Sequence, residues 1–283
     1  MGGPTVLGMA TLPNPLPRLT TDPSGRSLGL QLPPGRLIDA TDDGPWPEPL
    51  LWHADTPAAP GHWTALGGPA ARVGLLPVLV DLGDRQGGPE KWQLAPADVS
   101  YPGDHDAEDV LAEYWEGDED DEDSEDSEPR DFLAPFGPDW PGLAPAGRLT
   151  IDPGTCAAQV ADTLSDGSRD WPRAPHLALV PARRSADIPA AVGWSGPLNH
   201  DNDVARLCAV LRSWEDRFGI RVVALGFDTL VVSVAAPPVT RADAEALAAE
   251  HFAFCPDNLA HSRSVGAYAE ELTGARTWSF WWD

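Results

Sequence analysis

The sequence predicts an α+β protein whose C-terminal region, residues 149–283, forms a ferredoxin-like βαββαβ sandwich with one inserted helix. Three observations predict this fold. Elements with clear start and stop signals follow one another after residue 176. The apolar residues along this run change between helical spacing and alternation. A last segment rich in aromatic residues reads as a strand. Right-handed crossovers would place this last strand beside the first strand.

The C-terminal elements are predicted from capping residues and from glycine or proline stops. Asp152 precedes a proline at the first helical position, and Thr240 begins a capping-box-like segment. Gly219 and Gly274 stand where helices end. In chain order we expect a helix from residue 153, a strand at 176–182, a helix at 204–218, a hairpin at 220–235, a helix at 241–255, a helix at 265–272 and a strand at 277–283.

Tryptophan positions indicate which faces of these elements are buried. Trp214 lies on the apolar stripe of the helix at 204–218. In the last strand, Trp278, Phe280 and Trp282 share one face, and Trp281 lies on the other. We expect Trp214, Trp278 and Trp282 in the core.

The N-terminal region, residues 1–103, is predicted to be a loop-rich small β or α+β unit. Residues 1–150 hold 22 of the 31 prolines and 19 of the 27 glycines, which favours turns over regular structure. Pro77 lies inside one of the expected strands and predicts an edge strand or a broken one. Short strands are expected at residues 27–32, 49–54, 73–82 and 91–94.

The segment at residues 104–148 is predicted to contain a helix at 105–117, an acidic run and a proline-rich linker. Ten of the thirteen residues from 116 to 128 are acidic and none is basic. Charge of this density repels itself and offers nothing to bury, so we expect disorder. Three interpretations stay open: a solvated spacer, a tether for a basic partner, or a phosphorylation site at Ser124 or Ser127.

The charge and cysteine content limit the function classes. The formal net charge is −25, which repels nucleic acid and anionic membrane surfaces and favours a basic protein as partner. Three widely spaced cysteines without a CxxC motif predict a reducing, cytoplasmic location. No signal peptide or membrane-spanning stretch is expected, and no nucleotide or calcium motif predicts a cofactor.

One candidate site lies around the end of the helix at 241–255. His251 and Cys255 are four residues apart and share a helix face, with Glu250, Asp257 and His261 nearby. Such a pair suits a thiolate–imidazole nucleophile, and Cys, His and Asp are also zinc ligands. The alternative is that both are core residues, because free cysteine is usually buried.

A second candidate is the polar loop at residues 193–203. Its Ser, His and Asp residues suggest a triad, but the nucleophile elbow fails because Pro197 stands where G-x-S-x-G needs glycine. A loop that caps the next helix or contacts a ligand fits better. The binding candidates are Trp194, Asn199, His200 and Asp201, together with Asn258 of the first site.

The tryptophans in proline- and glycine-rich loops have two interpretations. They either anchor an irregular fold through buried area or form a protein-binding surface. These residues are Trp46, Trp52, Trp63, Trp140, Trp171 and Trp194.

Several separated strings of the C-terminal region resemble one family. The strings VPARRSADIPAAVGW, AVLRSWEDRFG, GFDTL, AAEHFAFCPDN and WSFWWD occur in order. Together they resemble the bacterial family known as domain of unknown function 4253, over about residues 175–283. The resemblance implies no activity and no catalytic residues.

The function expected from the sequence is that of a non-enzymatic, acidic, cytoplasmic protein-interaction module. It would act as an inhibitor or immunity-type partner of a basic protein. The alternative is an enzyme or metal-binding protein with a site at Cys255 and His251.

Overall fold

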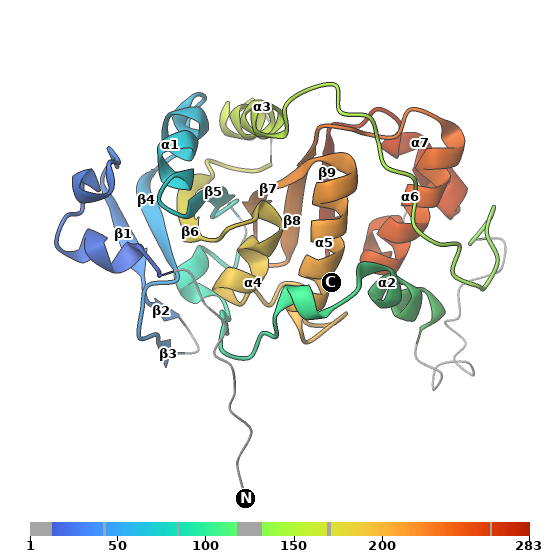
Figure 1. Ribbon diagram of the computed structural model, residues 1–283, viewed down its shortest axis with the longest axis horizontal. Coiled ribbons are helices and arrows are strands. Elements are labelled where there is room, and N and C mark those ends of the chain that lie inside the picture. The colour runs from blue at the N-terminus through green and yellow to red at the C-terminus, as the bar shows by residue number, and fades with distance from the viewer. Residues whose placement is uncertain (1–12, 42–43, 84, 118–131, 169–170, 261) are drawn as a thin grey trace, which may run out of the picture.

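The computed structural model describes residues 13–41, 44–83, 85–117, 132–168, 171–260 and 262–283. These residues form a mixed α/β fold around a seven-stranded mixed sheet (Figure 1). A separate ribbon pairs β2 (Ala40–Thr41) with β3 (Gly44–Pro45). The strands of the main sheet lie in the order β1 (Gly35–Ile38), β4 (Leu51–Pro57), β6 (His176–Pro181), β5 (Leu75–Val80), β7 (Ile220–Leu225), β8 (Thr229–Val234) and β9 (Thr277–Trp281).

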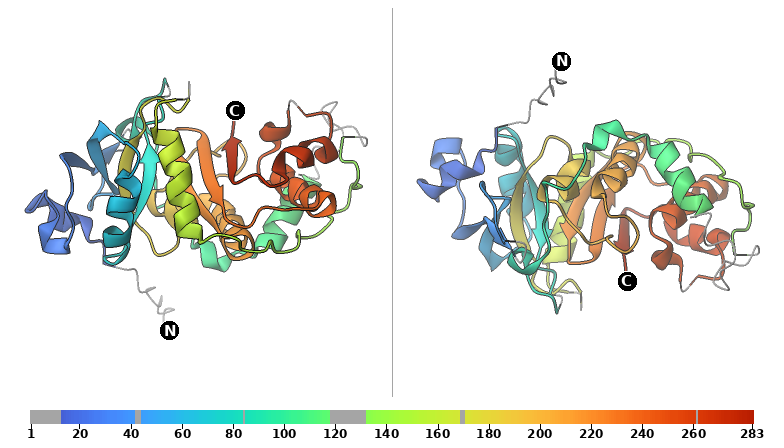
Figure 2. Two further views of the ribbon diagram at one scale, coloured as in Figure 1. Left: turned by 90° about the horizontal axis from the view of Figure 1, so that it is seen from above. Right: turned by 90° about the horizontal axis from the view of Figure 1, so that it is seen from below.

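Helices cover both faces of this sheet (Figures 1 and 2). In the described ranges the α-helices are α1 (His62–Ala71), α2 (Ala107–Glu116), α3 (Pro153–Ser165), α4 (Ile188–Val192), α5 (Val204–Phe218), α6 (Arg241–Phe254) and α7 (Val265–Leu272). The 3-10 helices are η1 (Leu16–Thr20), η2 (Arg26–Leu28), η3 (Pro89–Lys91), η4 (Pro102–Asp104), η6 (Ser185–Asp187) and η7 (Pro256–Leu259). None of the helices in these ranges combines the length and the apolar character needed to cross a membrane.

Two hydrophobic cores lie on the two faces of the sheet. One face packs Leu79 and Val231 against α1 and α3. The other packs Val78 and Val232 against a larger core that includes Trp214 and residues of α2, α5, α6 and α7. The alternation of neighbouring strand residues between two cores explains why β5 and β8 are apolar on both sides.

The capping signals of the C-terminal region are confirmed. Asp152 Oδ1 accepts a hydrogen bond from Thr155 N at 2.8 Å and starts α3. Thr240 Oγ1 accepts one from Asp243 N at 3.2 Å and starts α6. Gly219 closes α5 with φ of 61°, in the left-handed region that favours glycine. These local signals therefore place the helix ends correctly.

The last strand also has the predicted faces. Trp278, Phe280 and Trp282 are buried, whereas 45% of the surface of Trp281 is exposed. Trp214 stacks on Phe280 with a ring-centroid distance of 5.4 Å. The prediction of a core position for Trp214, Trp278 and Trp282 is confirmed.

The strand order of a ferredoxin-like sandwich is not found. The last strand, β9, pairs antiparallel with β8 at the end of the sheet instead of lying beside β6. β6 lies between β4 and β5, and β5 separates it from β7. Because β6 is antiparallel to β5 and β5 is parallel to β7, the connection through α5 is not a parallel crossover. The handedness rule for parallel crossovers therefore does not apply to it.

Strands from before residue 104 and from after residue 149 form one sheet. β1, β4 and β5 come from the N-terminal region, and β5 is inserted among the C-terminal strands. Pro77 was expected to make its strand an edge strand or a broken one, yet β5 is central. The parallel pairing of β5 with β7 is limited to Leu79 and Ala224, beyond the proline, so β7 requires no hydrogen bond from Pro77.

Two further expectations for the N-terminal region are corrected. Residues 27–32 were expected to form a strand, but Gly25 and Gly29 have φ of 71° and 73° and flank the 3-10 helix η2. Residues 91–94 contribute only an isolated bridge between Leu94 and Trp194. Helix α1 was not expected, because its sequence HWTALGGPAA contains two glycines and a proline.

The acidic run at 116–128 lies almost entirely outside the described residues, and so does the N-terminal stretch 1–12. Only Glu116 and Gly117 of the run are described, at the end of α2.

Candidate functional site

The Cys-Pro-Asp-Asn turn after α6 binds the outer edge of β9, the last strand of the sheet. Three side chains of the turn bond to the backbone of alternate residues of the C-terminal segment, and alternate residues of a strand present their backbone groups to the same edge. The turn therefore covers the edge of the sheet. The contacts are Asn258 Nδ2 to Ser279 O (2.7 Å), Trp281 N to Asn258 Oδ1 (3.1 Å), Cys255 Sγ to Trp281 O (3.1 Å) and Asp283 N to Asp257 Oδ2 (3.1 Å).

His251 lies in the aromatic part of the larger core. Its Nδ1 is 3.1 Å from the Tyr268 hydroxyl, and its ring packs against Trp214, Trp278 and Phe280. The side chain is fully buried. His251 thus bonds to α7 through Tyr268, whereas Cys255 bonds to β9.

Burial places the two groups in their neutral forms. Burial raises the pKa of the Cys255 thiol to about 12 and lowers the pKa of His251 to about 3. A thiolate–imidazolium pair requires the opposite shifts. In the part of the chain that the structure describes, no group of His, Cys, Asp or Glu side chains is arranged to hold a metal ion; His261 lies outside this part. His251 and Cys255 are therefore buried, hydrogen-bonded residues, and the turn that follows them covers the edge of β9.

Glu250, the neighbour of His251, is the centre of a buried polar network. Its carboxylate accepts hydrogen bonds from Trp214 Nε1 and Ala144 N, each at 2.7 Å. Arg217 binds both carboxylate oxygens, at 2.7 and 2.5 Å, and also donates to Ala144 O. Glu250 therefore joins α6 to α5 and to the segment that precedes α3.

The polar loop at 193–203 contacts three other parts of the molecule. Trp194 is buried, and its Nε1 donates to Gly226 O at 3.0 Å in the β7–β8 turn. Asn199 Nδ2 donates to Asp283 O at 2.7 Å. Near the end of the loop, Asp201 and the half-buried His200 contact α2. Each binding candidate of this loop thus has a partner within the protein.

Asp201 and His200 fix the position of α2. Asp201 Oδ2 accepts a hydrogen bond from the Tyr114 hydroxyl at 2.5 Å, and the same oxygen is 2.9 Å from Arg206 Nε. The His200 ring lies 4.5 Å from the Tyr114 ring, and burial lowers the pKa of His200. Arg206 also binds Glu113 of α2 at 2.8 Å. The candidate loop therefore fastens α2 to α5.

Most of the loop tryptophans are anchors. Trp52, Trp63 and Trp194 are buried, whereas Trp46 and Trp140 are half-buried. Trp171 is 39% exposed. Because Trp46 and Trp140 also pack against the larger core, the tryptophans other than Trp171 contribute buried area to the fold.

A group of exposed acidic side chains lies on and before α2. We define the α2 acidic surface as the exposed side chains Asp104, Asp106, Glu108, Asp109, Glu113 and Glu116. The opposite face of α2 buries Val110, Leu111 and Trp115, and the helix packs on α5 and α6 at the outside of the molecule (Figure 2). The fold therefore holds the acids outward on a fixed helix.

Few cations neutralise this surface. Between residues 104 and 128 the sequence contains 15 of the 44 acidic residues and no lysine or arginine. Among the described residues, Glu113 is the one member of the surface with an arginine partner, Arg206. The acidic run at 116–128 continues directly from α2. Sequence reasoning identified the run but not the exposed acids before it, whose orientation depends on which face α2 buries.

Comparisons with known proteins identify the C-terminal part of the chain. No curated protein and no solved structure matches the chain. A family model does match, and it confirms the resemblance found in the sequence. Residues 176–283, from β6 through β9, match the family described as Domain of unknown function (DUF4253), so this part of the chain is a domain of that family.

Proposed function

We propose that the protein is a non-catalytic binding protein, and that its partner is a basic protein bound by the α2 acidic surface and the acidic run. The observation that carries this proposal is the concentration of 15 acidic residues, without a lysine or arginine, between residues 104 and 128. A surface of this kind attracts a positively charged partner and speeds its association. An inhibitor or immunity-type role follows if the surface covers the working site of the partner.

The anchoring of α2 supports the proposal. Tyr114 bonds to Asp201, Trp115 to Pro138 O, and Glu113 to Arg206. The other acids of the helix stay exposed. A pre-positioned charged helix loses little conformational entropy when a partner binds.

The state of the candidate nucleophile supports the non-catalytic part of the proposal. Cys255 and His251 are both buried, with neutral forms favoured at pH 7. The three cysteines are free and buried, which supports a cytoplasmic location for this binding.

The experiment begins with affinity capture from a lysate of the native source at about 50 mM salt, followed by elution at about 500 mM salt. The eluted protein is identified and purified. Its dissociation constant is then measured for wild type and for the triple variant Asp104→Asn, Glu108→Gln, Glu116→Gln. Exposed ion pairs contribute about 0.5 kcal/mol each, so three lost pairs should weaken binding about tenfold.

A matched triple variant controls for the change in net charge. Glu48→Gln, Glu270→Gln, Glu271→Gln removes three exposed acids that lie outside the α2 acidic surface. It should bind within about twofold of wild type if the interaction is local. Equal weakening by both triple variants, or recovery of no basic protein, contradicts the proposal.

A further inference from the structure

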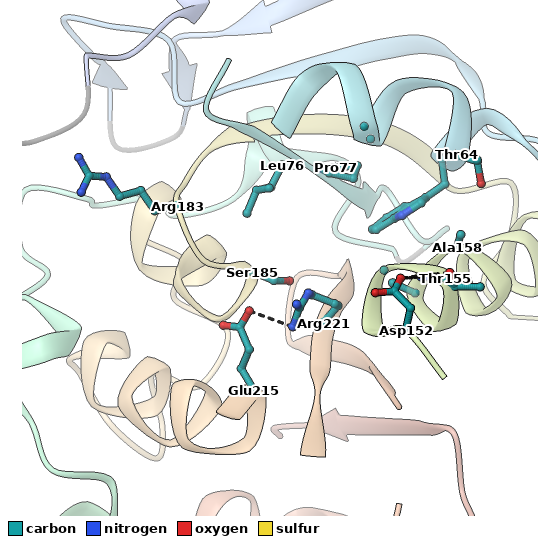
Figure 3. Close-up of a pocket in the computed structure, with 15 residues that line it drawn as sticks. Thr64, Leu76, Pro77, Asp152, Thr155, Ala158, Arg183, Ser185, Glu215 and Arg221 are labelled. Carbon is teal, nitrogen blue, oxygen red and sulfur yellow. Dashed lines mark hydrogen bonds and ion pairs between the residues drawn. The ribbon is translucent and has the colours of Figure 1, made fainter. Parts of the chain in front are cut away.

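A cavity of about 620 Å³ opens where β5 and β7 diverge (Figure 3). The two strands pair at Leu79 and Ala224, and their first residues lie apart. At the open end, Val222 N donates to Ser185 Oγ at 2.8 Å instead of to a strand. The volume lies in the range of about 300–1,000 Å³ that is usual for sites of small ligands.

One wall of the cavity is apolar. Leu76 and Pro77 of β5 line it together with Trp63 of α1 and Ala158 of α3. Figure 3 shows Leu76 and Pro77 on the side opposite Ser185, Arg221 and Glu215. A flat apolar group would bury its surface against this wall.

Two consecutive glycines of α1, Gly67 and Gly68, also line the cavity. Glycine in a helix interior costs about 1 kcal/mol relative to alanine. A Cβ atom on Gly67 would lie 3.4 Å from Pro77 Cγ and 3.9 Å from Trp63, and one on Gly68 would meet nothing within 4 Å. A side chain at Gly67 would therefore occupy the space between Trp63 and Pro77.

The opposite wall offers hydrogen-bond donors. Arg221 Nη1 bonds to Glu215 Oε1 at 3.0 Å and to Ile220 O at 2.6 Å. Among the described residues, its Nε and Nη2 have no partner. Ser185 is 7% exposed and accepts from Val222 N, so its hydroxyl hydrogen remains free to donate to a ligand. Arg183 lies at the rim, exposed and without an ion pair in the described chain.

The two carboxylates of the cavity already have partners. Glu215 is shared by Arg184, at 3.1 Å, and Arg221. Asp152 accepts from Thr155 N and Thr155 Oγ1. The groups of this wall that still lack a hydrogen-bond partner are therefore donors, and donors suit an anion.

We propose that this cavity binds a small aromatic carboxylate. The aromatic body lies against Trp63 and Pro77, and the carboxylate accepts hydrogen bonds from Arg221 and Ser185. The planar guanidinium of Arg221 matches a carboxylate with two parallel donors. This site is separate from the α2 acidic surface, so its test does not depend on the basic partner.

The experiment is a calorimetric titration of the full chain with 2-naphthoate and with 2-naphthamide, a neutral molecule of nearly the same shape. Naphthoate should bind at one site and about tenfold more tightly than naphthamide, because charge-assisted hydrogen bonds are stronger than neutral ones. Arg221→Met should reduce the affinity for naphthoate about tenfold and leave that for naphthamide within twofold. Glu215 keeps Arg184 in this variant, so its carboxylate is not left unpaired.

Two further variants separate the site from general charge and folding effects. Gly67→Leu should weaken both ligands more than tenfold by filling the cavity. If that variant fails to fold, Gly67→Ala provides the same test with a smaller side chain and one less helix glycine. Arg26→Met removes an exposed arginine elsewhere and should change neither affinity. Absent or unsaturable naphthoate binding, equal losses in Arg26→Met and Arg221→Met, or unchanged binding in both Gly67 variants would overturn the proposal.

Discussion

Replacing Glu250 by alanine should be among the most destabilising single changes in the chain. The side chain is fully buried and accepts four hydrogen bonds, two of them from Arg217, which is 15% exposed. Its removal leaves a largely buried guanidinium without its carboxylate. Breaking a buried pair in this way costs about 3–5 kcal/mol, and the unpaired Trp214 Nε1 is part of that cost.

This loss is large relative to a total stability of about 5–15 kcal/mol. We expect the midpoint of thermal unfolding to fall by roughly 6–20 °C, at about 2–4 °C per kcal/mol for a chain of this size. Urea denaturation followed by tryptophan fluorescence measures the free energy of unfolding directly. Glu270→Ala removes an exposed acid and should change stability by less than about 0.5 kcal/mol.

A double variant tests the cause of the loss. The double variant Glu250→Leu, Arg217→Met replaces both charges by apolar groups. When such groups pack well, this replacement changes the free energy of unfolding little. The double variant should therefore be more stable than the sum of the two single changes predicts. A loss below about 1 kcal/mol in Glu250→Ala, or strict additivity in the double variant, would refute the reasoning about this network.

Three further predictions concern residues outside this network. Burial, followed by the charge of Arg36, lowers the pKa of His53 to about 4 from 6.5. As pH falls, His53 is therefore protonated in the unfolded chain before it is protonated in the folded one. Up to about 3 kcal/mol of stability that is present above pH 6.5 is lost by pH 4. His53→Phe should flatten urea-denaturation stability over this pH range, and an unchanged slope would contradict this assignment. The Trp281 amide donates a hydrogen bond to Asn258 Oδ1, so Asn258→Ala should speed hydrogen exchange of this amide. Exchange of the Trp282 amide, which donates to Asp228 O, should stay unchanged. Equal effects on both amides would argue against the edge contact. Cys255 should resist thiol labelling until the protein unfolds, because its sulfur is buried and its pKa is raised to about 12, and stoichiometric labelling of the native protein would reopen the catalytic interpretation.

The local elements of the C-terminal region were predictable because their signals lie within a few residues of each element. Asp152, Thr240 and Gly219 act on the helix end next to them. Strand order depends instead on partners far apart in the chain. The insertion of β5 beside β7 rests on the pair Leu79 and Ala224, and no periodicity within either strand indicates it.

The candidate residues show the same limit. The structure buries both His251 and Cys255, but their spacing in the sequence did not indicate their partners Tyr268 and Trp281. The bond between Asn258 and the backbone of β9 joins residues more than 20 positions apart. The cavity escaped sequence reasoning for a related reason, because α1, β5, α3, η6, α5 and β7 each contribute part of its lining.

The polar residues named as binding candidates from the sequence differ from the polar residues whose hydrogen-bonding groups lack a partner in the described structure. Asn199, Asp201 and Asn258 bond to the protein itself and hold the C-terminal segment and α2 in place. A residue whose donors and acceptors are used internally has little capacity left for a partner. The free capacity lies in the exposed acids of α2 and in the donors of Arg221, which attract opposite charges. The two proposals therefore involve different surfaces, and a variant that impairs one should leave the other intact.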